Sequence, residues 1–134
     1  MEITKFHFHK RPSDSGELVF LEARRDISFE IKRVYYIYGV EQGRRRGLHA
    51  HKSLTQALIC IHGSCKVMLD DGKDKVHVVL NDPSEGLFVG NATWREMYDF
   101  SQDAVLLVLA SDYYDEQDYI RDYSDFLDYI GGKK

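Results

Sequence analysis

Residues 43–63 read GRRRGLHAHKSLTQALICIHG, and this stretch is the most informative part of the sequence. Written as a pattern, it is G-x5-HxH-x4-Q-x6-G, with the histidines at His49 and His51 and the glutamine at Gln56. Side chains two residues apart project from the same face of a β-strand. We therefore expect the two imidazoles to lie together on one wall of a sheet, where they can bind a metal ion or act as an acid–base pair.

Short strand-like runs separated by turn residues occur along the rest of the chain. The runs are 18–21, 29–40, 55–61, 65–69, 75–80, 86–89 and 104–109. Asp71-Gly72 is a strong hairpin signal, because these residues tolerate the positive φ of tight turns. Many short strands with regular turn signals are typical of an all-β sandwich or barrel.

The last part of the chain changes from strand to helix periodicity. Tyr119, Tyr123, Phe126, Leu127 and Ile130 recur at steps of three and four residues. A cap at residue 111 or 112 and the glycines at 131 and 132 give this segment a start and an end. The pattern predicts a short C-terminal helical tail over residues 112–130, packed on the outside of the barrel.

Composition and charge exclude several classes of protein. The chain has 134 residues, so we expect one domain over residues 1–134. A net charge of −4 argues against a general nucleic-acid binder, and no run approaches the roughly 18 apolar residues of a membrane span. The N-terminus lacks a secretion signal, and Cys60 and Cys65 form no CxxC motif. These features predict a cytoplasmic protein with no nucleic-acid or membrane partner.

The HxH stretch resembles the first motif of the cupins, a superfamily of small jelly-roll barrels. Gln56 stands where metal-binding cupins usually carry glutamate, and Arg95 stands where their second motif supplies another histidine. An amide is a poor metal ligand, and arginine offers no lone pair. His49 and His51 alone make a weak metal site, so we expect no metal and no cofactor.

The resemblance extends over roughly residues 15 to 130. The runs RRGLHAHK (45–52), WREMYDFS (94–101) and ASDYYDEQDYIR (110–121) are together similar to the WxcM-like dTDP-4-oxo-6-deoxy-D-glucose 3,4-ketoisomerases. This resemblance implies a single cupin barrel that isomerises dTDP-4-keto-6-deoxy-D-glucose to a 3-keto sugar without a metal. It also implies a homodimer formed by exchange of N-terminal strands, which we place within residues 1–28.

The reaction indicates roles for the candidate catalytic residues. The C3 hydrogen of a 4-keto sugar is α to a carbonyl, so a base with a pKa near neutrality can remove it. We assign His51 as this base and His49 as its partner, with the reverse assignment left open. Arg95 is expected to stabilise the enediolate, and Tyr38 to donate a hydrogen bond to a sugar oxygen.

Other residues are candidates for binding the substrate. The arginine fork matches phosphate geometry, so Arg46, three residues before the first histidine, is the best candidate for the diphosphate. Lys52 is a second phosphate contact. Gln56 is expected to hydrogen-bond the substrate or a histidine, and Arg33 to pair with a carboxylate or reach the ligand. Tyr36 is the alternative to Tyr38 as a donor to a sugar oxygen.

Three other functions compete with the isomerase. They are a dTDP-keto-sugar epimerase, a non-catalytic cupin that binds sugar nucleotides, and a metal-dependent cupin oxygenase. A permanently charged Arg95 cannot donate a proton as histidine does, which favours a product with glucose rather than galactose configuration at C4.

Overall fold

The structure, a computed structural model, describes residues 1–132. Residues 133–134 of the expected domain lie outside the described part. The elements are β1 (Lys5–His7), β2 (His9–Ser13), β3 (Gly16–Phe20), β4 (Arg33–Tyr38), β5 (Arg46–His51), β6 (Gln56–His62), β7 (Cys65–Asp70), β8 (Lys75–Leu80), β9 (Glu85–Val89), β10 (Trp94–Tyr98), β11 (Val105–Ala110), the 3-10 turn η1 (Glu116–Asp118), β12 (Tyr119–Ile120) and α1 (Tyr123–Gly131).

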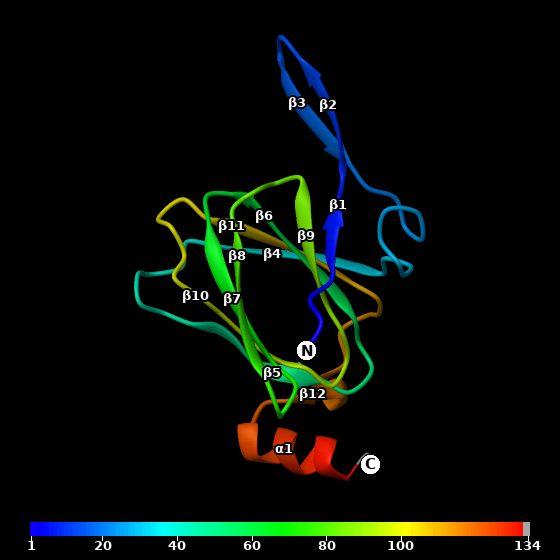
Figure 1. The fold of residues 1–134 in the computed structure, drawn as a ribbon, viewed down its shortest axis with the longest axis vertical. Helices are drawn as coiled ribbons and strands as arrows, with labels where there is room; N and C mark the ends of the chain where they lie inside the picture. Colours follow the sequence, from blue (N-terminus) through cyan, green and yellow to red (C-terminus); the bar gives the residue numbers. More distant parts are fainter. Residues whose placement is uncertain (133–134) are drawn as a thin grey trace.

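Two five-stranded sheets form the barrel (Figure 1). The first sheet has the order β1-β9-β6-β11-β4, and the second has the order β12-β5-β10-β7-β8. Every strand pair in both sheets is antiparallel. The all-β class predicted from the spacing of the strand runs is therefore confirmed, as is the short C-terminal helix.

The barrel interior is filled by alternate side chains from both sheets. Strand side chains alternate between the two faces of a sheet, so the apolar runs of β6, β7 and β11 supply every second residue to one core. Its fully buried members are Leu58, Cys60, Cys65, Val67, Leu87, Val89, Leu106 and Val108. Burying a side chain of this kind contributes about 1.5–3 kcal/mol to folding, so this core is a main source of the barrel's stability.

The turn between β7 and β8 is the hairpin that Asp71-Gly72 predicts. Gly72 has a φ of 93°, a value that glycine adopts without strain. Its N–H donates to Oδ1 of Asp70 at 2.7 Å. A Cβ at residue 72 would collide with Cδ1 of Ile130, so glycine also allows α1 to pack closely here.

The N-terminal segment leaves the barrel as a hairpin. β2 and β3 pair only with each other and project beyond the barrel, at the end opposite α1 (Figure 1). The chain then returns across the outside of the first sheet. There Ile27 packs with Phe8, Ala57, Ile59 and Leu109 in a second buried cluster.

The C-terminal tail corrects the helix predicted over residues 112–130. The helix α1 spans only Tyr123–Gly131, and its N-cap is Asp122, whose side chain accepts a hydrogen bond from the Asp125 N–H. Tyr119 lies instead on β12 and pairs with His51 of β5. The short strand β12 therefore extends the second sheet before the helix begins. Within residues 1–132, no helix is long and apolar enough to cross a membrane.

Candidate active site

A β-bulge in β5 places the first histidine. Arg95 of β10 pairs with His49 and Glu96 pairs with Gly47, so Leu48 is an extra residue in β5. Gly47 and Leu48 have φ values of 85° and 60°. A Cβ at residue 47 would lie 2.9 Å from Sδ of Met97, so this turn of the backbone requires glycine.

The bulge also determines which ring nitrogen of neutral His49 carries the proton. Its Nδ1 lies 3.0 Å from the carbonyl oxygen of Gly47. A carbonyl only accepts hydrogen bonds, so neutral His49 carries its proton on Nδ1. Its Nε2 is buried without a hydrogen-bond partner, and its lone pair is free to accept a proton.

His51 is held in the same way by a carboxylate. Its Nδ1 lies 3.1 Å from Oδ2 of Asp118, and its Nε2 is also buried without a partner. The two imidazoles meet edge to face, with ring centroids 4.9 Å apart. The prediction that His49 and His51 project together from one strand is confirmed.

Both imidazoles are neutral at physiological pH. Burial, and after it the charge of Arg95, lower the pKa of His49 from 6.5 to about 4. The same two causes, followed by His49, lower the pKa of His51. The site therefore holds two uncharged bases side by side, each ready to accept a proton.

A buried cation lies beside the two imidazoles, on the neighbouring strand β10. Arg95 is only 1% exposed. It donates to the Thr93 carbonyl at 3.1 Å and to Oε1 of Gln56 at 2.6 Å, so these bonds leave its positive charge uncompensated. Burial lowers the pKa of Arg95 to about 10, which still leaves it protonated at neutral pH. A fixed positive charge inside a barrel stabilises an anion that develops there.

Gln56 connects Arg95 to a tyrosine on the opposite sheet. Because arginine can only donate, the amide oxygen of Gln56 must face Arg95, and its Nε2 then donates to the Tyr35 hydroxyl oxygen at 3.1 Å. The hydroxyl proton of Tyr35 is therefore free for another acceptor. Burial raises the pKa of Tyr35, so this proton is present at neutral pH.

A cavity of about 550 Å³ opens beside these groups. Its lining includes Arg33 and Tyr35 from the first sheet, His49 from the second, and Arg46 at the start of β5. His51 instead lines a smaller, polar cavity of about 110 Å³ that also contains Asp118. His49 is thus the imidazole that faces the larger space.

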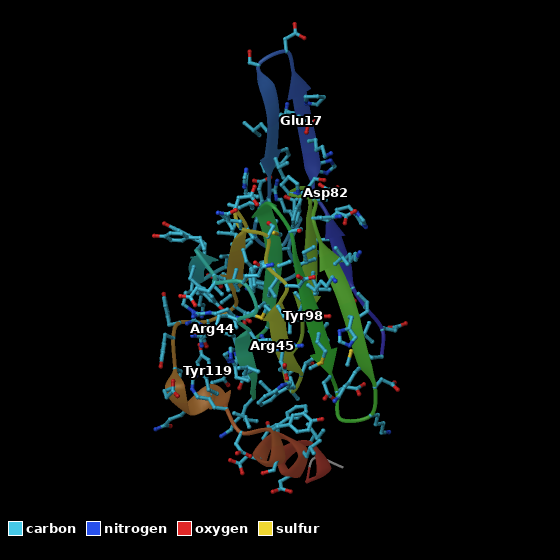
Figure 2. All side chains as sticks on the ribbon, turned by 90° about the vertical axis from the view of Figure 1, so that its left-hand side faces the viewer. Glu17, Arg44, Arg45, Asp82, Tyr98 and Tyr119 are labelled. Atoms are coloured by element: carbon cyan, nitrogen blue, oxygen red, sulfur yellow. The ribbon has the colours of Figure 1, made fainter. Side chains whose placement is uncertain are left out.

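The segment of residues 116–121, in which the sequence predicted no site residue, covers the histidines. The ring centroid of Tyr119 lies 5.0 Å from that of His49 and 4.3 Å from that of His51. Arg121 stacks on Tyr119 at 4.2 Å and binds Glu116 through two hydrogen bonds, of 2.7 and 2.9 Å. Figure 2 shows Tyr119 at the α1 end of the barrel, far from Glu17 on the hairpin. The run ASDYYDEQDYIR contains all these residues, but only pairing with β5 reveals their place.

Two predicted tyrosines do not reach the histidines. Tyr36 and Tyr38 are 62% and 70% exposed on the outer face of β4. They line a separate groove with Arg44, Arg45 and Arg46. Side chains of β4 alternate between its two faces, and the face that points inward carries Tyr35 rather than Tyr36 or Tyr38.

The other residues predicted to bind the substrate also lie in different places. Arg33 and Arg46 line the larger cavity, and the Nε of Arg33 is buried without a hydrogen-bond partner. Lys52 lies outside both histidine cavities, in a depression beside α1, because the chain turns away after His51. Gln56 contacts Arg95 and Tyr35 rather than a histidine. Within residues 1–132, no three His, Cys, Asp or Glu side chains gather where they could bind one metal ion.

Comparison with known proteins gives consistent matches over nearly the whole chain. A family model described as WxcM-like, C-terminal, matches residues 1–131. A TDP-4-oxo-6-deoxy-alpha-D-glucose-3,4-oxoisomerase from Aneurinibacillus thermoaerophilus is 52% identical over 130 residues, which are 97% of this chain and 94% of that protein.

Two solved structures are equally similar in fold. A 3,4-ketoisomerase from Helicobacter canadensis is 47% identical, with a TM-score of 0.95 and coverage of 98% of both chains. A variant of the 3,4-ketoisomerase from Thermoanaerobacterium thermosaccharolyticum, with one histidine replaced by asparagine, was solved in complex with TDP-4-keto-6-deoxyglucose. It is 45% identical, with a TM-score of 0.95, covering 98% of this chain and 95% of that one.

Proposed function

Because this chain belongs to the WxcM-like family, we propose that it is an isomerase that converts dTDP-4-keto-6-deoxy-D-glucose to the 3-keto sugar nucleotide. One observation carries this proposal: two neutral imidazoles with free Nε2 atoms stand beside a buried, uncompensated arginine. The named activities of the relatives support the choice of substrate. Proton transfer through an enediolate uses each of these groups.

We assign the first proton transfer to His49 rather than to His51. His49 lines the larger cavity, whereas His51 lies behind it. Nε2 of His49 takes the C3 hydrogen, the electron pair forms the C3–C4 double bond, and the negative charge moves to the C4 oxygen. The charge of Arg95 stabilises this oxyanion. The Tyr119 ring, which lies against both imidazoles, turns aside as the sugar approaches.

The remaining proton transfers balance the reaction. Tyr119 lines both cavities, so the same movement of its ring opens His51 to the sugar. Nε2 of His51 then takes the C3 hydroxyl proton and gives it to the C4 oxygen, so that the C3 oxygen carries the charge. The C3 carbonyl then forms as C4 takes a proton from the Tyr35 hydroxyl, and solvent returns the proton of His49 to Tyr35. C3 is oxidised and C4 reduced within one molecule, so the step requires no redox cofactor, and Arg95 supplies the positive charge that the oxyanion needs.

The position of Tyr35 favours glucose configuration at C4. In a gluco-configured ring, the hydrogens on C3 and C4 project from opposite faces, whereas in a galacto-configured ring they project from the same face. His49 lies on β5 of one sheet, and Tyr35 lies on β4 of the other. A base and an acid on opposite walls of the barrel match the first arrangement.

The nucleotide is proposed to extend from the sugar cavity over the arginines. Arg46 and Arg45 line both this cavity and the groove that contains Tyr36 and Tyr38. Arg45 is already engaged by Glu96 at 3.1 Å and by the Tyr98 ring, which leaves Arg46 to bind the diphosphate. The exposed Tyr36 offers a ring for the base.

The test is incubation of the purified protein with dTDP-4-keto-6-deoxy-D-glucose, followed by NMR. We expect a 3-keto product whose C4 hydrogen is axial, shown by a large coupling to the C5 hydrogen, both before and after treatment with a chelator. No turnover of this substrate would refute the isomerase. An axial C4 hydroxyl would refute only the assigned configuration, and loss of activity with metal removal would refute the metal-free mechanism.

We also propose a homodimer that exchanges N-terminal strands. The β2–β3 hairpin stands away from the barrel, and an isolated hairpin is marginally stable in water. β4 is an edge strand that exposes Val34 and Tyr38, and such edges favour pairing with another chain. Light scattering should give twice the 15.6 kDa chain mass. Deletion of residues 9–20 should give monomers, and a monomeric full-length protein would contradict this proposal.

A further inference from the structure

Asp118 contacts His51 from a segment 67 residues further along the chain. Its Oδ1 accepts the Ser53 N–H at 2.8 Å, and its Oδ2 accepts the Leu54 N–H at 3.3 Å. Although burial raises the pKa of Asp118, the two backbone hydrogen bonds together with the contact to His51 outweigh burial and lower the pKa below its usual value. The carboxylate is therefore ionised and fixed in place before any substrate binds.

These hydrogen bonds determine which nitrogen of His51 carries the proton. A carboxylate only accepts hydrogen bonds, and its Oδ2 faces Nδ1 of the imidazole. We propose that Asp118 is a positioning residue, which keeps the proton of His51 on Nδ1 and its Nε2 free to accept a hydroxyl proton. The role of Nε2 rests on the proposed function, whereas the position of the proton does not.

An amide in place of this carboxylate would move the proton of His51 to the other ring nitrogen. The backbone N–H groups of Ser53 and Leu54 can only donate, and the bond from Ser53, at 2.8 Å, is shorter than the 3.3 Å bond from Leu54. We therefore expect the side chain introduced by Asp118→Asn to turn its oxygen toward Ser53 and to give up the longer bond to Leu54. Its NH₂ group then faces Nδ1 of His51 and donates to it. The imidazole proton moves to Nε2, which can no longer act as a base.

Asp118 also has a structural role, because it accepts hydrogen bonds from the backbone of the loop at residues 53 and 54. The two roles predict different results. Loss of a loop anchor alone lowers stability and leaves the histidine proton on Nδ1. Loss of the positioning role moves that proton and lowers kcat, while KM changes little. A spectroscopic measurement on the histidine therefore separates them.

The first experiment is two-bond ¹H–¹⁵N NMR of the histidine side chains in the resting protein at neutral pH, which requires no substrate. We expect His51 to carry its proton on Nδ1 in the wild type and on Nε2 in Asp118→Asn. The matched control is Asp112→Asn, which replaces another carboxylate of the same small cavity, one that bonds only the Tyr113 N–H at 2.8 Å among the hydrogen bonds described. A wild-type His51 protonated on Nε2 would overturn the proposal without any variant, as would an unchanged His51 in Asp118→Asn.

The second experiment is steady-state kinetics with the keto-sugar nucleotide. We expect Asp118→Asn to lower kcat about 100-fold, near the lower end of what a positioned acid or base contributes, with KM within about 3-fold of wild type. Asp112→Asn should retain wild-type kcat. Unchanged kcat in Asp118→Asn would overturn the role of the free Nε2. Absence of turnover in the wild type would instead refute the proposed function and leave the proton position, as measured by NMR, intact.

Discussion

The His49→Asn variant is expected to lose both isomerisation and hydrogen exchange at C3, with kcat reduced about 10³-fold. Asparagine retains a polar side chain that can reach the Gly47 carbonyl, but it offers no nitrogen lone pair to accept a proton. The measurement is NMR of the sugar nucleotide in deuterium oxide, which reports product formation and deuterium at C3 of recovered substrate together. Both should fall by the same factor, because both begin with removal of the C3 hydrogen.

The control for this variant is His62→Asn, at the exposed end of β6, where the imidazole bonds the Asp103 carbonyl. It should react as the wild type does. Deuterium at C3 at the wild-type rate in His49→Asn would identify another residue as the base.

The pH profile provides a second measurement of the same assignment. His49 faces Arg95, His51, Arg121 and Glu116, and burial together with the first of these lowers the pKa of His49 to about 4. A base must be unprotonated, so kcat/KM should stay level as the pH falls and decline only near pH 4. An unperturbed histidine would already lose half its activity near pH 6.5.

The Tyr35→Phe variant is expected to separate the two halves of the reaction. Product formation should fall about 100-fold, because C4 loses its proton donor. Exchange of the C3 hydrogen with deuterium oxide should continue, because His49 and Arg95 are unchanged. The variant should also lose about 1–2 kcal/mol of stability, since Nε2 of Gln56 no longer has its acceptor.

The matched control is Tyr98→Phe, on β10. It removes a hydroxyl that hydrogen-bonds Nδ1 of His77 at 2.6 Å, outside the cavity beside His49. It should form product at the wild-type rate. If Tyr35→Phe also formed product at that rate, the acid at C4 would have to be another group.

Sequence periodicity located the strands and the histidine pair because both depend on local rules. Alternation along a strand places His49 and His51 on one face wherever that strand lies. The replacement of two metal ligands by Gln56 and Arg95 is also visible in the sequence, but the hydrogen bond between these two side chains was not predicted, because it depends on how the two sheets face each other.

The rest of the site depends on contacts that the sequence does not encode locally. Alternation in β4 separates Tyr35 from Tyr36 and Tyr38, but it does not say which face points inward, and a shift of one residue reverses the choice. Asp118 and Tyr119 join the site only because β12 pairs with β5. Helical spacing in residues 119–130 concealed that strand.

The extra residue in β5 has a consequence for enzyme design. In a regular strand with the same two histidines, the carbonyl of Gly47 would not face Nδ1 of His49. The proton of that imidazole could then lie on either ring nitrogen. A scaffold that receives only the HxH pair therefore gains two imidazoles, but nothing determines which nitrogen of the first one can accept a proton. The bulge at Gly47 and Leu48 should therefore be transferred together with both histidines, because the Gly47 carbonyl holds the proton of His49 on Nδ1.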